Sequence, residues 1–162
     1  VVMSAERAKQ LGVPNPVPIL GFGQGQTSWE VAQRPTLTST AAVQSAETAF
    51  AMAGIRPEDV DVAQLYDCFT ITVLLTLEDY GFCAKGEGGA FVEGGNIELG
   101  GRLPVNTHGG QLGEAYIHGL NGVAEGVRQI RGTSPNQVKG VEHVLVTAGT
   151  GVPTSAVILG QP

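Results

Sequence analysis

Short apolar runs alternate with amphipathic stretches along most of this chain, and this alternation constrains the fold more than any other feature. Apolar runs bounded by Gly, Pro or polar positions are typical of strands, and they lie at residues 18–23, 60–65, 143–148 and 155–159. Between them, apolar residues recur every three or four positions, which predicts helices, at residues 42–53, 69–80 and 112–131. The order of these elements predicts a layered α/β domain with helices packed on a mixed sheet.

Residues at the predicted helix ends support this assignment. Thr38 or Ser39 stands where the first helix needs an N-cap, and Gly54 follows its last apolar position. Asp67 occupies the expected N-cap of the second helix, and Gly132 follows the third. We therefore expect three helices with ordinary start and stop signals.

Composition argues against several classes of function. The chain has 162 residues, enough for one domain, and 42% of them are hydrophobic, as in a globular protein. A net charge of −6 without a basic cluster argues against a nucleic-acid partner, and no apolar run reaches the length of a membrane span. Cys68 and Cys83 lack the spacing of metal ligands, so we expect no metal and a reducing, cytoplasmic setting. Because the chain starts with Val1 rather than Met, we expect a piece of a longer protein.

Residues 105–122 carry the clearest indication of chemistry. The turn Asn-Thr-His-Gly-Gly at residues 106–110 runs into a predicted helix that begins with Tyr116 and His118. Glycines let the backbone approach a ligand, and N–H groups at a helix start can bind an anion or a polarised carbonyl. Positions two apart on a helix point to different sides, so we expect Tyr116 and His118 not to face one another. A plain chain reversal would account for the same turn.

Three other residues have both a functional and a structural interpretation. Tyr66 follows a predicted strand, where ligands bind in open α/β sheets, although a tyrosine packed at a sheet edge would look the same. Cys68 is a candidate nucleophile at a helix start, but its bulky neighbour Phe69 favours a small buried thiol. His143 has no polar partner nearby in the sequence, and we interpret it as structural.

Several short motifs, taken in order, resemble the C-terminal half of a thiolase. The likeness is greatest to the sterol-carrier-protein thiolases and their relatives, the lipid-transfer proteins. The motifs are Tyr-Asp-Cys-Phe at residues 66–69, Gly-Phe-Cys at 81–83, Asn-Thr-His-Gly-Gly at 106–110, Gly-Leu-Asn-Gly at 119–122 and a strand–glycine turn–strand at 143–159. Each motif is weak alone, but as a set they are specific and cover nearly the whole chain.

Departures from the thiolase pattern bear directly on the reaction. Counting without gaps from the Gly-Gly turn, the thiolase histidine that activates the nucleophilic cysteine falls on Tyr116. The turn at residues 148–154 lacks the acid–base cysteine of the last thiolase motif, and Tyr66 stands where thiolases have His or Asn. Thiolysis is therefore not expected. Two tyrosines at these positions resemble the thiolase-like aldolases of steroid side-chain degradation, which cleave a β-hydroxyacyl-CoA by a retro-aldol step into a ketone and a shorter acyl-CoA.

This resemblance implies roles for individual residues. Tyr66 and Tyr116 are expected to share deprotonation of the substrate hydroxyl and donation to the oxygen that gains charge, without a fixed division between them. A free phenol has a pKa of about 10, and we expect a second tyrosine, a histidine or a helix N-terminus to lower it. His108 is expected to donate to the thioester carbonyl, His118 to brace the helix, and Asn106 to belong to the substrate-binding turn. Backbone N–H groups are expected to complete an oxyanion hole, at Gly109, Gly110, Gly149 and Gly151.

The resemblance also implies the architecture and the partners. We expect residues 1–162 to form a thiolase-like C-terminal domain, an α/β/α layered fold with a mixed five-stranded sheet. The fifth strand is expected at residues 1–3 or in the glycine-rich loop at residues 81–101. Expected partners are an acyl-CoA substrate, an N-terminal thiolase half, a homodimer mate and a small protein with an OB-fold and a zinc ribbon. No cofactor is expected beyond the coenzyme A of the substrate.

Two alternatives remain open at the level of sequence. A thiolase-type acyltransferase would need the histidine role to move to His108 or His118, and it would act on a 3-ketoacyl-CoA with free CoA. A non-catalytic thiolase-like subunit would bind lipid or act as a scaffold. Replacing Tyr66 and Tyr116 would then alter assembly but not turnover.

Overall fold

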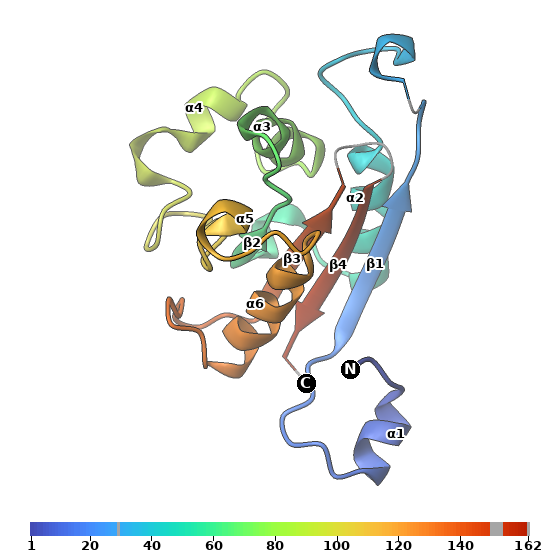
Figure 1. Ribbon diagram of the computed structural model, residues 1–162, viewed down its shortest axis with the longest axis vertical. Coiled ribbons are helices and arrows are strands. Elements are labelled where there is room, and N and C mark those ends of the chain that lie inside the picture. The colour runs from blue at the N-terminus through green and yellow to red at the C-terminus, as the bar shows by residue number, and fades with distance from the viewer. Residues whose placement is uncertain (29, 150–153, 162) are drawn as a thin grey trace.

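The computed structural model describes residues 1–28, 30–149 and 154–161, in which four strands form one mixed sheet (Figure 1). The strands, in spatial order, are β1 (Ile19–Gly25), β4 (Thr154–Gly160), β3 (His143–Ala148) and β2 (Val62–Gln64). The β1–β4 and β3–β4 pairs are antiparallel, whereas β2 and β3 run parallel. All four predicted strands are confirmed, with their ends shifted by one or two residues in most cases.

The prediction of a five-stranded sheet is wrong in the described part of the chain. Neither residues 1–3 nor residues 81–101 form a strand. A single parallel bridge at Val105 extends the sheet beyond β2, where Ala63 N–H donates to Pro104 O at 3.1 Å and Asn106 N–H donates to Ala63 O at 2.9 Å. This bridge places the turn at residues 106–110 beside the end of β2.

Helices cover both faces of the sheet, so the expected α/β/α layering is confirmed. One apolar cluster lies between the sheet and α2 (Ala42–Ala53), and a second lies between the opposite face and α6 (Leu120–Arg131). Figure 1 shows the two helices on opposite sides of the strands. The remaining helices are α1 (Ala5–Gln10), α3 (Thr70–Asp79), α4 (Gly88–Val92) and α5 (Gly110–Gly113), with short 3₁₀ turns at Val31–Gln33, Pro57–Asp59 and Glu93–Gly95.

Alternate glycines of β1 allow α2 to pack backbone against backbone. A Cβ on Gly23 would overlap the main-chain oxygen of Ser45, and Gly21 and Gly25 meet α2 in the same way one turn to either side. The Ser45 hydroxyl donates to Gly23 O at 3.1 Å across this contact. The spacing of two residues on the strand thus matches the spacing of four on the helix.

Two helix ends follow the prediction and two starts do not. Gly54 and Gly132 end α2 and α6 in the left-handed conformation, both with φ of 69°. Ser39 does not cap α2, because its hydroxyl donates to the buried carboxylate of Asp79 at 3.3 Å, and Ala42 N–H bonds to Thr40 Oγ1 at 3.0 Å instead. The second helix begins at Thr70, so Asp67 is not its N-cap.

The described helices are too short or too polar to cross a lipid bilayer. The long segment at residues 81–101 is partly ordered as α4, whereas the sequence predicted an irregular loop.

Candidate active site

The helix predicted at residues 112–131 is broken into two pieces, and the break forms the candidate site. α5 ends at Gly113, and α6 begins only at Leu120. His118 and Gly119 have positive φ, 53° and 85°, which is incompatible with a continuous right-handed helix. Tyr116 and His118 therefore lie in a connecting segment. The expectation that their side chains point apart is wrong, because their rings pack with centroids 4.7 Å apart at 50°.

The two predicted tyrosines meet. The Tyr66 and Tyr116 hydroxyls lie 2.9 Å apart, within hydrogen-bond distance. Tyr66 follows β2 and is held there by its backbone N–H, which donates to Thr147 Oγ1 of β3 at 3.1 Å. Tyr66 is buried, whereas Tyr116 is 58% exposed. The pair therefore has one member fixed in the fold and one at the surface, where a substrate can reach it.

The pair holds the Tyr66 proton more firmly than an isolated phenol does. The hydrogen bond to Tyr116 and burial raise the pKa of Tyr66 to about 12, with a further contribution from the nearby Asp67 and Cys68. The prediction that a second tyrosine lowers the phenol pKa is therefore wrong for Tyr66. The physical reason is that Tyr116 contributes no positive charge, and burial disfavours the phenolate. Tyr66 thus keeps its proton at neutral pH and is able to donate a hydrogen bond.

An alkaline titration checks this property. We expect phenolate absorbance to show Tyr66 and Tyr80 ionising near pH 12, because burial raises the pKa of Tyr80 to about 12 as well. Their folded-state pKa values exceed the unfolded value of about 10, so this stabilisation is complete below pH 10 and is lost as the pH rises through 12. Tyr66→Phe should remove one late-titrating group. Ionisation of that group near pH 10 would contradict the assignment.

Asp67 joins the end of β2 to α5. Its carboxylate accepts from Gln111 N–H at 3.2 and 3.3 Å and from Gln111 Nε2 at 3.1 Å. A Cβ at Gly110 would overlap this carboxylate, and Gly110 has φ of 71°, so only glycine fits. The carboxylate therefore lies against Gly110 on the side where a Cβ would stand. The role of the Gly110 N–H as an oxyanion donor stays a prediction.

The turn at residues 106–110 is held by its own polar groups. Asn106, with φ of 51°, accepts from Leu65 N–H at 2.7 Å through its side-chain oxygen. Gly109 N–H donates to Asn106 O at 2.8 Å, so this predicted oxyanion donor is engaged within the turn. Gly149 follows β3 with φ of 91°, and Gly151 lies outside the described residues. Asn106 and Gly109 therefore shape the turn.

Both ring nitrogens of His108 are occupied. Nδ1 lies 2.8 Å from Gln64 Oε1, an acceptor, and Nε2 lies 3.2 Å from Asn121 Nδ2, a donor. These partners require a neutral ring with its proton on Nδ1. His108 therefore does not present an N–H to the substrate, contrary to the expectation that it donates to the thioester carbonyl.

A buried polar network behind His108 was missed at the level of sequence. Gln64 Nε2 donates to Thr107 Oγ1 at 2.9 Å, and Thr107 donates to Glu125 Oε1 at 2.7 Å. Gln129 Nε2 donates to both Thr107 and Glu125 at 3.0 Å. The signal in the sequence was a polar residue at every fourth position of α6, at residues 121, 125 and 129. All three are buried in the structure. The network anchors the turn to α6.

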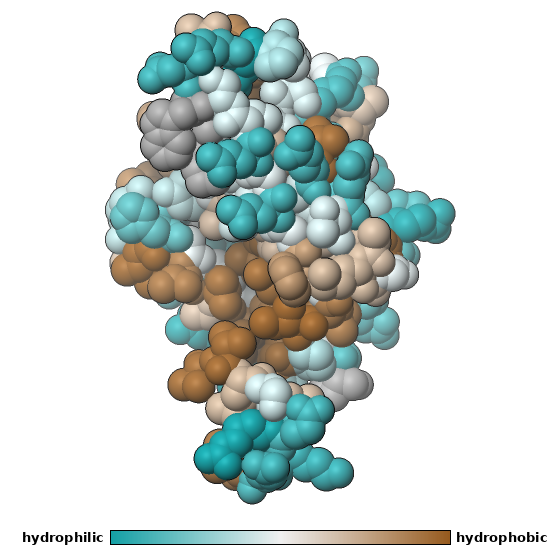
Figure 2. Space-filling view, turned by 90° about the vertical axis from the view of Figure 1, so that its right-hand side faces the viewer, coloured by the Kyte–Doolittle hydropathy of each residue, from teal (hydrophilic) through white to brown (hydrophobic). Residues whose placement is uncertain are grey.

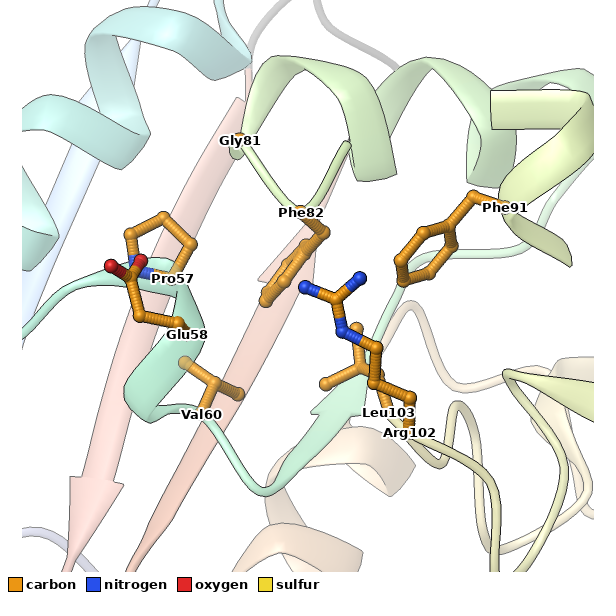
Figure 3. A pocket seen from close by; sticks show the side chains of 8 residues that line it. All are labelled: Pro57, Glu58, Val60, Gly81, Phe82, Phe91, Arg102 and Leu103. Carbon is orange, nitrogen blue, oxygen red and sulfur yellow. The ribbon is translucent and has the colours of Figure 1, made fainter. Parts of the chain in front are cut away.

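A cavity in the described part of the chain lies away from the tyrosines. It has a volume of about 140 Å³ and is lined by Pro57, Glu58, Val60, Gly81, Phe82, Phe91, Arg102 and Leu103. Figure 3 shows the Arg102 guanidinium reaching between two phenylalanines, and it lies 5.4 Å from the centre of the Phe91 ring. None of the predicted site residues lines this cavity.

A smaller cavity, of about 10 Å³, lies at the tyrosine site. Tyr66, Asp67, His108, Gln111 and Asn121 are among its lining residues. Within the described ranges, His, Cys, Asp and Glu side chains form no group of three that could hold a metal ion.

Comparisons with known proteins agree with this architecture. The family described as "Thiolase C-terminal domain-like" matches residues 23–161. Over 99% of its length the chain is 56% identical to the "17-hydroxy-3-oxo-4-pregnene-20-carboxyl-CoA lyase" of Mycobacterium tuberculosis and 52% identical to the "Steroid side-chain-cleaving aldolase" of Thermomonospora curvata. The solved structure described as "Ltp2-ChsH2(DUF35) aldolase" superposes with a TM-score of 0.92 at 50% identity, over 98% of this chain.

The chain spans less than half the length of these relatives. It covers 42% of each of the two curated proteins and 43% of the solved chain. The match to the domain family nevertheless extends over most of the sequence described above. The chain therefore belongs to the thiolase C-terminal domain-like family.

Proposed function

We propose that this domain forms part of a lyase that cleaves a branched β-hydroxyacyl-CoA, with a steroid as the acyl group, by a retro-aldol reaction. The observation that carries the proposal is the hydrogen-bonded pair of Tyr66 and Tyr116 at the two positions where thiolases have other residues. The names of the two curated relatives, a pregnene carboxyl-CoA lyase and a steroid side-chain-cleaving aldolase, support the substrate class.

The reaction needs a base and a donor but no covalent acyl-enzyme. A base removes the proton of the β-hydroxyl, the oxygen becomes a ketone, and the bond between the α and β carbons breaks. The electron pair of that bond forms the enolate of the thioester. Protonation of the α carbon then releases the shorter acyl-CoA. This chemistry does not require the thiolase cysteine that residues 148–154 lack.

The exposure of Tyr116 and the pKa of Tyr66 favour a division of roles. Tyr116 is exposed and accessible to a substrate hydroxyl, so it is the base. Tyr66 keeps its proton, with a pKa of about 12, and donates to the Tyr116 oxygen, which stabilises the phenolate when it forms. His118 packs against the Tyr116 ring and fixes its orientation. The N–H groups of Gly149 and Gly151 remain candidates for binding the enolate oxygen.

An exposed apolar face supports the expected second thiolase half. Ile19 and Phe22 of β1 pair with Leu159 and Val157 of β4, whose side chains lie on the α6 side of the sheet. The helix α6 lies mainly over β2 and β3, so it leaves this face of β1 uncovered. Phe22 is 59% exposed. Figure 2, which faces this side of the molecule, shows apolar side chains gathered across its middle. We assign this face to contact with the N-terminal half of the full-length protein.

A charged side chain at this face should lower the thermal stability of the full-length protein. We expect Phe22→Asp to lower its thermal unfolding temperature, because burying a phenylalanine contributes about 1.5–3 kcal/mol and a buried carboxylate adds a further penalty. Gln44→Asp, at an exposed position of α2 on the opposite side of the sheet, is the control and should have little effect. Equal unfolding temperatures for the two variants would remove this face from the interface.

Other partners are proposed on the same relatives. The solved structure names ChsH2(DUF35) together with Ltp2, and we propose a partner of that type here, which corresponds to the expected small OB-fold and zinc-ribbon protein. A homodimer mate is proposed from the resemblance to thiolases.

Product analysis by mass spectrometry tests the proposed function. The full-length protein with its partner receives either a tertiary β-hydroxyacyl-CoA or a 3-ketoacyl-CoA with free CoA. We expect a ketone and a shorter acyl-CoA from the first substrate and no turnover of the second. Thiolysis of the second would establish an acyltransferase, and no turnover of either would favour a non-catalytic subunit.

A further inference from the structure

The side-chain amide of Asn121 has a fixed orientation. Its nitrogen donates to Ala115 O at 3.1 Å and to His108 Nε2 at 3.2 Å. A reversed amide would place its oxygen against the carbonyl oxygen of Ala115, which cannot donate. The Asn121 oxygen therefore points away from both partners.

The chain of hydrogen bonds behind Asn121 reinforces this orientation. Asn121 donates to His108, which donates to Gln64, which donates to Thr107, which donates to the Glu125 carboxylate. Every donor points toward the same negative charge, so the bonds strengthen one another. Glu125 is 1% exposed, and the whole chain is anchored in the core.

Asn121 Oδ1 is left without a hydrogen-bond partner among the described residues. Asn121 is 2% exposed, and buried polar atoms of native proteins have a partner in the great majority of cases. Gln111 Oε1 is a second buried acceptor without a hydrogen-bond partner among the described residues. The Gln111 amide is oriented by its nitrogen, which donates to the carboxylate of Asp67. Both residues line the small cavity beside Tyr66.

These two acceptors define what the cavity can bind. We propose that Asn121 Oδ1 and Gln111 Oε1 form a binding site for one O–H donor of the size of water, either a water molecule or the β-hydroxyl of the substrate before that hydroxyl gives its proton to Tyr116. A cavity of about 10 Å³ has room for one such group. An anion or a carbonyl group does not fit, because both free atoms are acceptors. The substrate alternative rests on the proposed lyase function, whereas the water alternative does not.

Crystal structures of the full-length protein with its partner test the site. In the substrate-free protein we expect an ordered water within hydrogen-bond distance of Asn121 Oδ1. A complex of the Tyr116→Phe variant with a tertiary β-hydroxyacyl-CoA, compared with its deoxy analogue, separates the two sources. Ligand density reaching Asn121 only with the hydroxyl present identifies the substrate, and a water that persists in both complexes identifies water. No oxygen near either acceptor in any of the three structures would overturn the proposal.

Kinetics supply an independent test in solution. Asn121→Leu and Gln111→Met each remove a whole side-chain amide, the free acceptor together with its nitrogen donor, while keeping similar volume. Each should lower kcat/KM roughly tenfold or more. Asn96→Leu is the matched control, because the Asn96 amide donates to Phe91 O away from the site. Gln111→Met lies at a half-buried position and leaves the chain ending at Glu125 intact. Values for Gln111→Met equal to those for Asn96→Leu would contradict the proposal, even if Asn121→Leu failed to fold.

The two kinds of test separate failure of this site from failure of the proposed lyase activity. A protein that cleaves no hydroxyacyl-CoA but holds water at Asn121 would refute the lyase and keep the site. An active lyase without an oxygen at Asn121 would refute this site and keep the proposed lyase activity.

Discussion

Tyr116→Phe is expected to lower kcat for cleavage of a β-hydroxyacyl-CoA by roughly 10²–10⁴-fold, the range of a general base. The variant keeps the ring that packs on His118 and loses only the hydroxyl that meets Tyr66 at 2.9 Å. Because Tyr116 is 58% exposed, the loss of one hydroxyl should not disturb folding. Steady-state kinetics on the full-length protein with its partner measure the effect.

A second tyrosine provides the control for this substitution. Tyr80 is buried and donates its hydroxyl to Ser45 Oγ at 3.1 Å, on the far side of the sheet from the site. Tyr80→Phe should cost stability through the lost hydrogen bond and leave kcat near the wild-type value. Full activity of Tyr116→Phe, or an equal loss in the two variants, would remove Tyr116 from the reaction.

Gly23→Ala is expected to destabilise the domain strongly, by about 3 kcal/mol or more. The added Cβ would overlap the main-chain oxygen of Ser45, and backbone atoms cannot move aside as a flexible side chain can. Relief would require α2 to move away from β1 along its whole length, because Gly21 and Gly25 make the same contact. Chemical denaturation of the full-length protein measures the loss.

Gly89→Ala is the matched control for this prediction. Gly89 lies in α4, and a Cβ there meets no atom within 4 Å. The change should be neutral or stabilise by up to about 1 kcal/mol, because alanine favours a helix over glycine. Equal stability of the two variants would show that β1 and α2 are not packed as described.

The strands and the first helix could be predicted because local signals determine them. The apolar run at residues 143–148 coincides with β3, and Gly54 ends α2 as glycine does at a left-handed C-cap. Tyr66 and Tyr116 could be named as a pair because the motif resemblance supplied the register between two distant segments. Their contact at 2.9 Å needs the fold, since 50 residues separate them.

The errors arose where contacts distant in sequence override local pattern. Apolar periodicity predicted one helix over residues 112–131, but positive φ at His118 and Gly119 breaks it. On α6 the inward face holds Gly126, which approaches Val144 and Val146, and the polar Glu125, which is paired with Thr107. A stripe of glycine and polar residues does not look like a buried face until the partner segment is known.

The single measurement that tests the central claim most directly is the cleavage of a tertiary β-hydroxyacyl-CoA in D₂O by the full-length protein with its partner, followed by mass spectrometry. The account predicts an unlabelled ketone and an equal amount of shorter acyl-CoA with one deuterium at the α carbon, formed without added CoA. An acyl-CoA that forms only when free CoA is supplied, or a substrate that remains intact, would contradict it.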